Sequence, residues 1–410
     1  MQQVTNQQKL KPWIGFVLFA VIMALFIFVC VPMQNAWGTW GLVATESLFL
    51  VIAIVYGLIF KIPLKEMFPI KKFSVRDFFG SLMLVMGGSL FGLISVALVG
   101  TLFPSTVEGG DFEAILNIVS DGPGYLLTMF IIALMPAICE EAIHRGAILT
   151  SFRSIKKEWV IVLIMGLFFG INHLSWLRFI NTAILGASLS YIVIKKNNIL
   201  LSSLMHFILN FSAATSSYLS TMYLRKNMGA DLSGSDIAAM AGDNVMKTAL
   251  PSYLLMGVAA PFLVVLGLLL LNPAGHKKIR FLFAGIIAVI CFACSIGLTA
   301  AKMTSSQVAQ GTFSYRVTQE NTESSDIDLD IKEDGNYTVI CALMDGKGDY
   351  YIRITDDSGN VISNAQIPSG TIRTYTSVKS LEKGSYHLTV VNGSHTMGEQ
   401  PTIQIQVMKA

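Results

Sequence analysis

Charged side chains are scarce in this sequence. Only 13% of its 410 residues are Asp, Glu, Lys or Arg, whereas 53% are hydrophobic. An average soluble protein has roughly 25% charged residues. This shortage excludes an ordinary water-soluble globular chain and implies that lipid solvates much of the surface. The net charge of +3 is too small to indicate any class of partner.

Cysteine is also scarce, with five in the whole chain. Four of them, at positions 30, 139, 291 and 294, lie in apolar runs, where cysteine packs as a small hydrophobic residue. Cys341 has no obvious partner in the sequence. We therefore expect no disulfide framework.

Long apolar runs fill residues 1–300. A helix that crosses a bilayer needs about 20 apolar residues. The runs that qualify, or nearly do, are 13–32, 40–60, 78–103, 124–144, 159–173, 177–194, 199–221, 250–271 and 281–300. The first run is longer than the core of a signal peptide and no A-x-A cleavage site follows it, so we interpret it as a retained helix. The run at 159–173 is short for a span, which suggests a re-entrant or tilted segment.

The loop charges predict an orientation. Cytoplasmic loops of membrane proteins carry an excess of Lys and Arg. Basic residues gather in the loops at 61–76, 153–157, 195–196 and 277–280, and they are absent from those at 33–39 and 104–123. We expect an integral, multi-pass protein of the cell membrane, with a cytoplasmic N-terminus and residues 301–410 outside the cytoplasm.

The pattern changes near residue 325. Ile327, Leu329 and Ile331 alternate with aspartates, as in a half-buried strand. Turn signals such as Asp334-Gly335 recur after this point, which is typical of a small antiparallel sandwich. The predicted fold is an all-α polytopic membrane bundle of about nine segments at 1–300, a linker at 301–324, and an all-β, sandwich-like extracytoplasmic domain at 325–410. Its position alone makes this domain a candidate for binding a protein partner.

A first group of ionisable residues lies inside an apolar run, where each costs roughly 2.5–3.5 kcal/mol to insert. Glu141 and Arg145 are four residues apart and can pair on one helix face. Glu140 is rotated by about 100° and lacks such a partner in its own helix. An unpaired buried carboxylate is suited to take a proton from water. Pro136, which lacks an N–H, should kink the helix one turn earlier.

Two further motifs follow on later helices. Phe169 and His173 are four residues apart, as are His206 and Asn210. The imidazole and amide of the second pair share a helix face and can donate hydrogen bonds to an oxyanion. Seen alone, each motif fits an interfacial histidine or a helix–helix hydrogen bond. The three motifs together predict a buried polar site that can activate water.

These motifs resemble those of the CPBP (Abi) family of CAAX proteases and bacteriocin-processing enzymes, which includes the type II CAAX prenyl endopeptidase. The resemblance covers about residues 120–220. It implies an intramembrane endopeptidase in which Glu140 activates water, His173 orients it, and His206 with Asn210 stabilises the oxyanion. The candidate catalytic residues are Glu140, Glu141, His173, His206 and Asn210, with Arg145 and Phe169 as substrate-binding or structural residues. The expected partners are the lipid bilayer and a membrane-associated or lipidated peptide or protein, and no nucleic acid.

The cofactor is open at this point. Glu140, His173 and His206 could bind Zn²⁺ and leave one position free, and the family name implies a metalloendopeptidase. The helix-borne HExxH pair is missing, however, and the residues also fit a metal-free scheme, which we favour slightly. Straight helices would separate His173 from the other groups by roughly 10–15 Å in depth, so the site requires a kink, a tilt or a re-entrant segment.

Two other functions are open as well. A non-catalytic membrane scaffold could retain the same buried residues. A transporter or proton relay could use them too, although it would favour internal repeats, and the sequence has no clear repeat.

Overall fold

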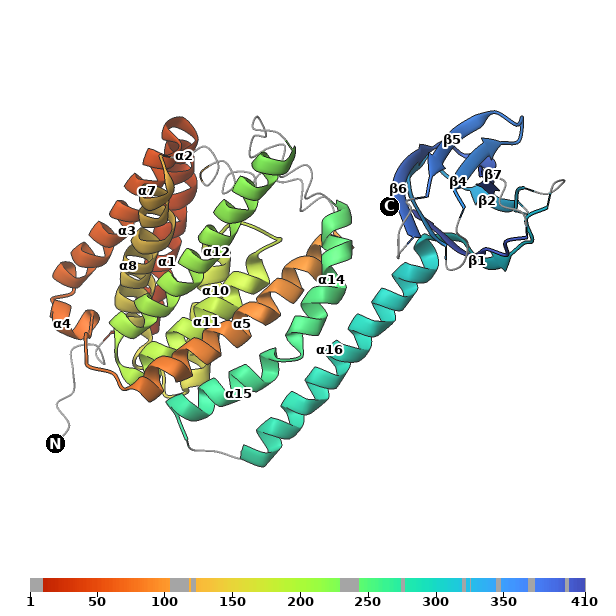
Figure 1. Cartoon of the computed structure of the whole chain (residues 1–410). Helices are drawn as coiled ribbons and strands as arrows, with labels where there is room; N and C mark the ends of the chain where they lie inside the picture. Colours follow the sequence, from red (N-terminus) through yellow and green to blue (C-terminus); the bar gives the residue numbers. More distant parts are fainter. Residues whose placement is uncertain are drawn as a thin grey trace. The chain divides into compact units, whose positions relative to one another are not determined.

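The structure is a computed structural model of the whole chain (Figure 1). It describes residues 10–103, 118, 123–228, 243–273, 277–318, 322–324, 326–343, 348–367, 373–394 and 398–409. The chain divides into two compact units, Met1–Ile296 and Gly297–Ala410. The first is helical and the second is built of strands.

The helical elements are drawn from red through green to turquoise in Figure 1. Up to the first motif its elements are α1 (Pro12–Leu25), the π-helical η2 (Phe26–Cys30), α2 (Val31–Trp37), α3 (Thr39–Ile59), α4 (Leu64–Met67), α5 (Val75–Leu102), α7 (Tyr125–Met129), the π-helical η4 (Phe130–Leu134) and α8 (Met135–Glu141). They continue with the π-helical η5 (Ala142–Ile148), α9 (Leu149–Phe152), α10 (Glu158–Asn172), α11 (Phe179–Lys196), α12 (Ile199–Met228), α14 (Asp243–Gly257), α15 (Ala260–Leu271) and α16 (Lys277–Ser306).

Seven helical stretches among the described residues are long and apolar enough to cross a membrane. They are Pro12–Trp37, Thr39–Ile59, Val75–Leu102, Tyr125–Phe152, Ile199–Tyr223, Ala249–Leu271 and Lys278–Ala301. The other two of the nine predicted segments form α10 and α11. At 15 residues α10 is short for a span, and α11 carries polar residues and two lysines in its 18 residues. The membrane bundle is confirmed, with a count of seven by length and composition.

Helices α10 and α11 lie against each other at two glycines. A Cβ atom on Gly166 would lie 2.8 Å from the carbonyl oxygen of Ala183, and one on Gly170 would lie 2.9 Å from that of Phe179. Glycine therefore permits the close backbone contact between these helices, as small residues do in membrane bundles. This contact sets the position of the C-terminal turn of α10, which carries Phe169 and ends before His173.

Basic loops meet at one end of the bundle. Lys195, near the end of α11, pairs with Glu158 at the start of α10. Lys196 Nζ lies 2.6 Å from Asp77 Oδ1 at the start of α5. The guanidinium of Arg153 donates to the Asn197 side chain at 3.4 Å. The loops at 153–157 and 195–196 therefore share one end of the bundle with the start of α5, as the positive-inside argument requires of loops on one side of a membrane.

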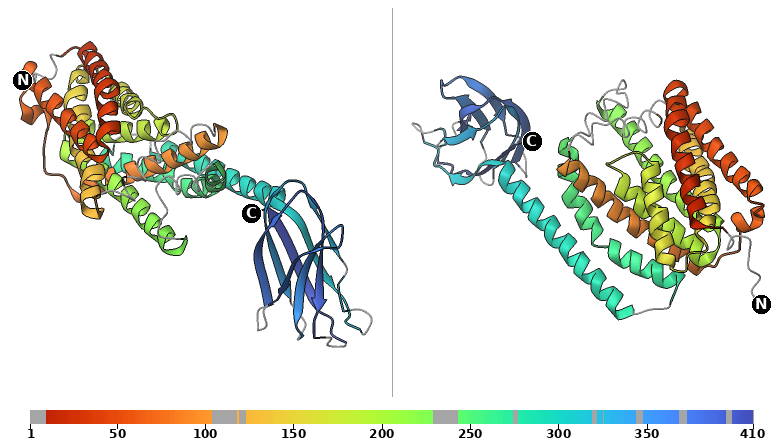
Figure 2. Two further views of the ribbon diagram at one scale, coloured as in Figure 1. Left: turned by 90° about the horizontal axis from the view of Figure 1, so that it is seen from above. Right: turned by 180° about the vertical axis from the view of Figure 1, so that it is seen from behind.

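The second unit consists of two antiparallel four-stranded sheets, in the orders β1-β8-β3-β6 and β2-β7-β4-β5 (Figure 2). The strands are β1 (Gln307–Ser314), β2 (Ile327–Ile331), β3 (Gly335–Leu343), β4 (Tyr350–Asp356), β5 (Val361–Gln366), β6 (Arg373–Leu381), β7 (Gly384–Asn392) and β8 (Thr402–Lys409). Inward residues of both sheets, among them Leu329, Val339, Ile352 and Ile405, form one buried core. The predicted all-β, sandwich-like domain is confirmed.

The boundary between the units differs from the prediction. The expected linker at 301–324 contains the end of α16 and strand β1. Strand β1 pairs with β8, placing Gly311 opposite Ile405. Its sequence is polar and lacks apolar alternation, so it gave no local signal. Pairing with a strand from the other end of the domain holds it in the sheet, which sequence pattern alone does not reveal.

Candidate functional site

Glu141 is a fully buried anchor between helices. Its Oε1 lies 2.6 Å from Arg145 Nη1 and 3.1 Å from His206 Nδ1. Its Oε2 accepts a hydrogen bond from Ser202 Oγ at 2.5 Å. Arg145 Nη2 also donates to the Gly186 carbonyl at 3.0 Å. The predicted pairing of Glu141 with Arg145 is confirmed, and the same carboxylate also binds α12. With both oxygens engaged, Glu141 holds three elements together and has little freedom to accept a further proton.

Glu140 has a different environment although it is the adjacent residue. Its Oε2 is buried, lacks a hydrogen-bond partner among the described residues, and lies 3.9 Å from His206 Nε2. That separation is too long for a hydrogen bond. Burying a carboxylate oxygen without a partner is costly. The residue is therefore a strong candidate to interact with a water molecule or a substrate.

The hydrogen bonds assign the tautomers of two histidines. His206 Nδ1 faces the Glu141 carboxylate, and His173 Nδ1 lies 2.8 Å from the carbonyl oxygen of Phe169. Both oxygens only accept, so each Nδ1 carries the proton. The Nε2 of each neutral ring is then an acceptor. His206 can donate toward Glu140 or an oxyanion only when its ring carries a second proton.

Phe169 is the common contact of the three motifs. Its ring centroid lies 4.8 Å from that of His173, 5.8 Å from that of His206 and 5.1 Å from that of His144. The Arg145 guanidinium lies over the same ring, 4.6 Å from its centroid, a favourable cation–π position. Phe169 is only 1% exposed. It packs as a structural centre that fixes the ring positions around it.

The depth problem posed by straight helices is resolved by irregular geometry. The π-helical η4 ends immediately before α8, whose first turn contains Pro136, and the π-helical η5 follows directly after Glu141. Such π segments occur frequently at functional sites. Together with the short α10, they bring His173 and His206 within 6 Å of one Phe169 ring, measured between ring centroids. Asn210 lies one turn beyond His206 on α12 and is partly exposed.

The prediction did not include Glu46 of α3. Its side chain is 3% exposed and its Oε2 lacks a hydrogen-bond partner in the described structure. Helix α3 packs against α8, the helix that carries Glu140. The available signal was that Glu46 is the single acidic residue of the apolar run at 40–60. Glu46 and Glu140 thus each have one buried carboxylate oxygen without a hydrogen-bond partner among the described residues.

His144 was also missed as a site residue. Its ring is fully buried, and neither nitrogen has a hydrogen-bond partner among the described residues. It follows Glu140 by four residues, a spacing that places both on one helix face. His144 thus adds a third imidazole to the surroundings of Phe169.

The metal expectation does not fit the observed arrangement. Across the described residues, no group of three or more His, Cys, Asp or Glu side chains could hold a metal ion. Glu140, His173 and His206 are near one another without forming such a group. We therefore derive no chemical step through a metal.

Comparisons with known proteins give one match at the site. The family model described as "Rce1-like: Type II CAAX prenyl endopeptidase Rce1-like" matches residues 122–212, which contain all three motifs. Among curated proteins, none matches the chain. A solved carbohydrate binding module from Cellvibrio mixtus lichenase 5A, in complex with cellotriose, is 18% identical, with 26% of this chain and 93% of that chain covered and a TM-score of 0.18.

Proposed function

We propose that this chain is an endopeptidase that cleaves membrane-associated or lipidated peptides or proteins. Its match over residues 122–212 supports a CPBP/CAAX intramembrane protease family. The observation that carries the proposal is the contrast between two adjacent glutamates. Glu141 is fully bonded, whereas Glu140 keeps a buried oxygen without a partner 3.9 Å from His206 Nε2.

In the proposed reaction, Glu140 takes a proton from water as the water oxygen attacks the peptide carbonyl. The same carboxyl group can then pass that proton to the leaving nitrogen, so that the C–N bond breaks to release a neutral amine and not an amide anion. The bare Nε2 of His173 can accept the second hydrogen of the water and so orient it.

The oxyanion needs a donor, and His206 and Asn210 are the two candidates. The Asn210 side-chain amide donates in any protonation state. His206 donates through Nε2 only as an imidazolium, because its Nδ1 proton already binds Glu141. Glu141 would stabilise that imidazolium, as the buried aspartate does for the histidine of a serine-protease triad. We therefore assign the oxyanion contact first to Asn210 and the orientation of His206 to Glu141.

Comparative peptidomics tests the proposed activity and requires no identified substrate. Membranes that contain wild-type protein should yield cleaved termini that are missing with Glu140→Ala. A set of termini that is identical in the two samples would contradict the proposal and favour a scaffold.

Hydrolysis is expected to persist after metal removal. The scheme uses a glutamate and neutral hydrogen-bonding groups, so a chelator such as 1,10-phenanthroline should lower the rate by less than about twofold, well below the 10²-fold or greater effect of losing a general base. The measurement is cleavage by purified full-length protein before and after chelation. Loss of cleavage, with recovery on addition of zinc, would show that a metal is required.

The orientation is part of the proposal. We place the protein in the cell membrane, with a cytoplasmic N-terminus and the β domain outside. Protease added to intact cells should then remove epitopes in the 327–409 segment and spare an epitope fused before residue 10. Protection of the β domain in intact cells, with cleavage after lysis, would reverse the orientation.

Glu46→Met is expected to stabilise the folded protein. The substitution removes a buried carboxylate that lacks a partner for one oxygen, a group that costs roughly 2.5–3.5 kcal/mol in a membrane segment. The melting temperature in detergent should rise, with a smaller rise for Glu46→Gln, which keeps a polar group. A lower melting temperature for the methionine variant would mean that Glu46 has a stabilising partner.

A further inference from the structure

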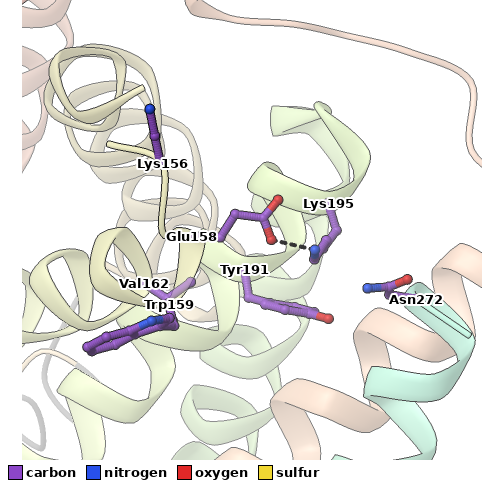
Figure 3. Close-up of a pocket in the computed structure, with 7 residues that line it drawn as sticks. All are labelled: Lys156, Glu158, Trp159, Val162, Tyr191, Lys195 and Asn272. Carbon is purple, nitrogen blue, oxygen red and sulfur yellow. Dashed lines mark hydrogen bonds and ion pairs between the residues drawn. The ribbon is translucent and has the colours of Figure 1, made fainter. Parts of the chain in front are cut away.

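A cavity of about 420 Å³ lies outside the candidate site (Figure 3). Its lining residues are Lys156, Glu158, Trp159, Val162, Tyr191, Lys195 and Asn272. They come from the loop before α10, from α10 and α11, and from the residue that follows α15. None belongs to the three motifs. Its volume lies within the range of roughly 300–1,000 Å³ that is typical of small-molecule sites.

The cavity lies at the basic end of the membrane bundle. α10 begins at Glu158, α11 ends at Lys196, and α15 ends at Leu271, so the lining gathers at helix ends. Trp159 is 64% exposed. Exposed Trp and Tyr rings at helix ends are typical of the membrane–water interface. The location indicates contact with lipid headgroups on one side of the cavity.

The lining carries excess positive charge. Lys195 forms an ion pair with Glu158, drawn as a dashed line in Figure 3. Lys156 is exposed and adds a second ammonium, so the lining as a whole has one net positive charge. The single carboxylate, Glu158, is offset by its own lysine partner.

Polar and apolar groups lie on different parts of the lining. The Tyr191 hydroxyl points toward Asn272 in Figure 3. These groups can donate to a phosphate or a glycerol hydroxyl. Trp159 and Val162 extend together on α10 and offer an apolar wall. A ligand that suits this lining has an anionic head and an apolar tail.

We infer that this cavity binds the headgroup of an anionic phospholipid. The phosphate lies at Lys156 and beside the Lys195–Glu158 pair, the polar end of the headgroup contacts Tyr191 and Asn272, and an acyl chain follows Trp159 and Val162. Basic pockets between helices at a membrane surface bind anionic headgroups by this combination. A free phosphate would use the lysines but would leave the apolar wall unused. The inference is independent of the proposed peptidase activity.

Native mass spectrometry of the full-length protein in a neutral detergent tests the site. The probes are phosphatidylglycerol and phosphatidylcholine with identical acyl chains, supplied in equal amounts. Wild-type protein should retain phosphatidylglycerol at least fivefold over phosphatidylcholine. Lys156→Ala should reduce that preference to below twofold, whereas Lys156→Arg should keep it. Glu158→Gln should increase it, because the competing carboxylate is removed.

The matched control is Lys65→Ala, which removes an exposed lysine from the basic loop at 61–76 without touching the cavity. This variant should keep the wild-type preference. An equal loss in Lys65→Ala and Lys156→Ala would show general surface attraction and overturn the site. A wild-type protein without a preference between the two lipids would also overturn it. Displacement of the lipid by a tenfold excess of inorganic phosphate would identify a free anion as the ligand and would overturn it too.

Discussion

Replacement of Glu140 by glutamine is expected to lower peptide hydrolysis about 10²- to 10⁴-fold, the usual contribution of a general acid–base group. The amide keeps the shape of the side chain but cannot take a proton from water. The fold should be retained, because the Glu140 Oε2 has no hydrogen-bond partner to lose in the described structure. The measurement is the rate of cleavage of a peptide identified by peptidomics, beside the melting temperature of each variant.

Two variants make this comparison specific. Glu66→Gln, on α4 and outside all three motifs, should cleave at the wild-type rate. Glu141→Gln should lose stability as well as activity, because three groups bind that carboxylate. If Glu140→Gln retained more than a tenth of the wild-type rate, another group would have to be the base.

Removal of Arg145 is expected to destabilise the fold by about 3–5 kcal/mol, the usual cost of leaving one member of a buried ion pair without its partner. Both side chains of the Arg145–Glu141 pair are fully buried. Arg145→Met would leave the Glu141 carboxylate charged and uncompensated between α8 and α12, and would also empty the cation position over Phe169. The measurement is the change in melting temperature between wild type and variant, from thermal unfolding in detergent.

The double variant separates charge from packing. Glu141→Gln combined with Arg145→Met removes both charges and should recover part of the lost stability. As a matched control, Lys195→Met breaks a more exposed ion pair with Glu158 and should cost no more than about 1 kcal/mol. An Arg145→Met variant as stable as this control would contradict the anchoring role of Glu141.

The candidate site was predictable where it depended on charges inside apolar runs. Glu140, Glu141, His173 and His206 stand out there because lipid gives such groups no solvation. The Glu141–Arg145 pair followed from helical spacing alone. Contacts between distant helices were not predictable in this way. The link from Glu141 to Ser202 and His206, which fixes a tautomer, required α8 and α12 to meet.

Two other features depended on tertiary packing in the same way. Glu46 joins the site only because α3 packs against α8, and its own run contains no second polar motif. Strand β1 belongs to the sandwich only because β8 pairs with it. In both cases a partner that is distant in sequence determines the structural role.

The most direct test of the central claim, that Glu140 activates water for peptide hydrolysis, is a single-turnover cleavage in H₂¹⁸O by the purified full-length protein. The wild type is expected to give a product whose new carboxyl terminus contains one solvent oxygen. Glu140→Gln, folded to the same melting temperature, is expected to give almost no product. Equal product from the two proteins, or a new terminus without solvent oxygen, would contradict the account.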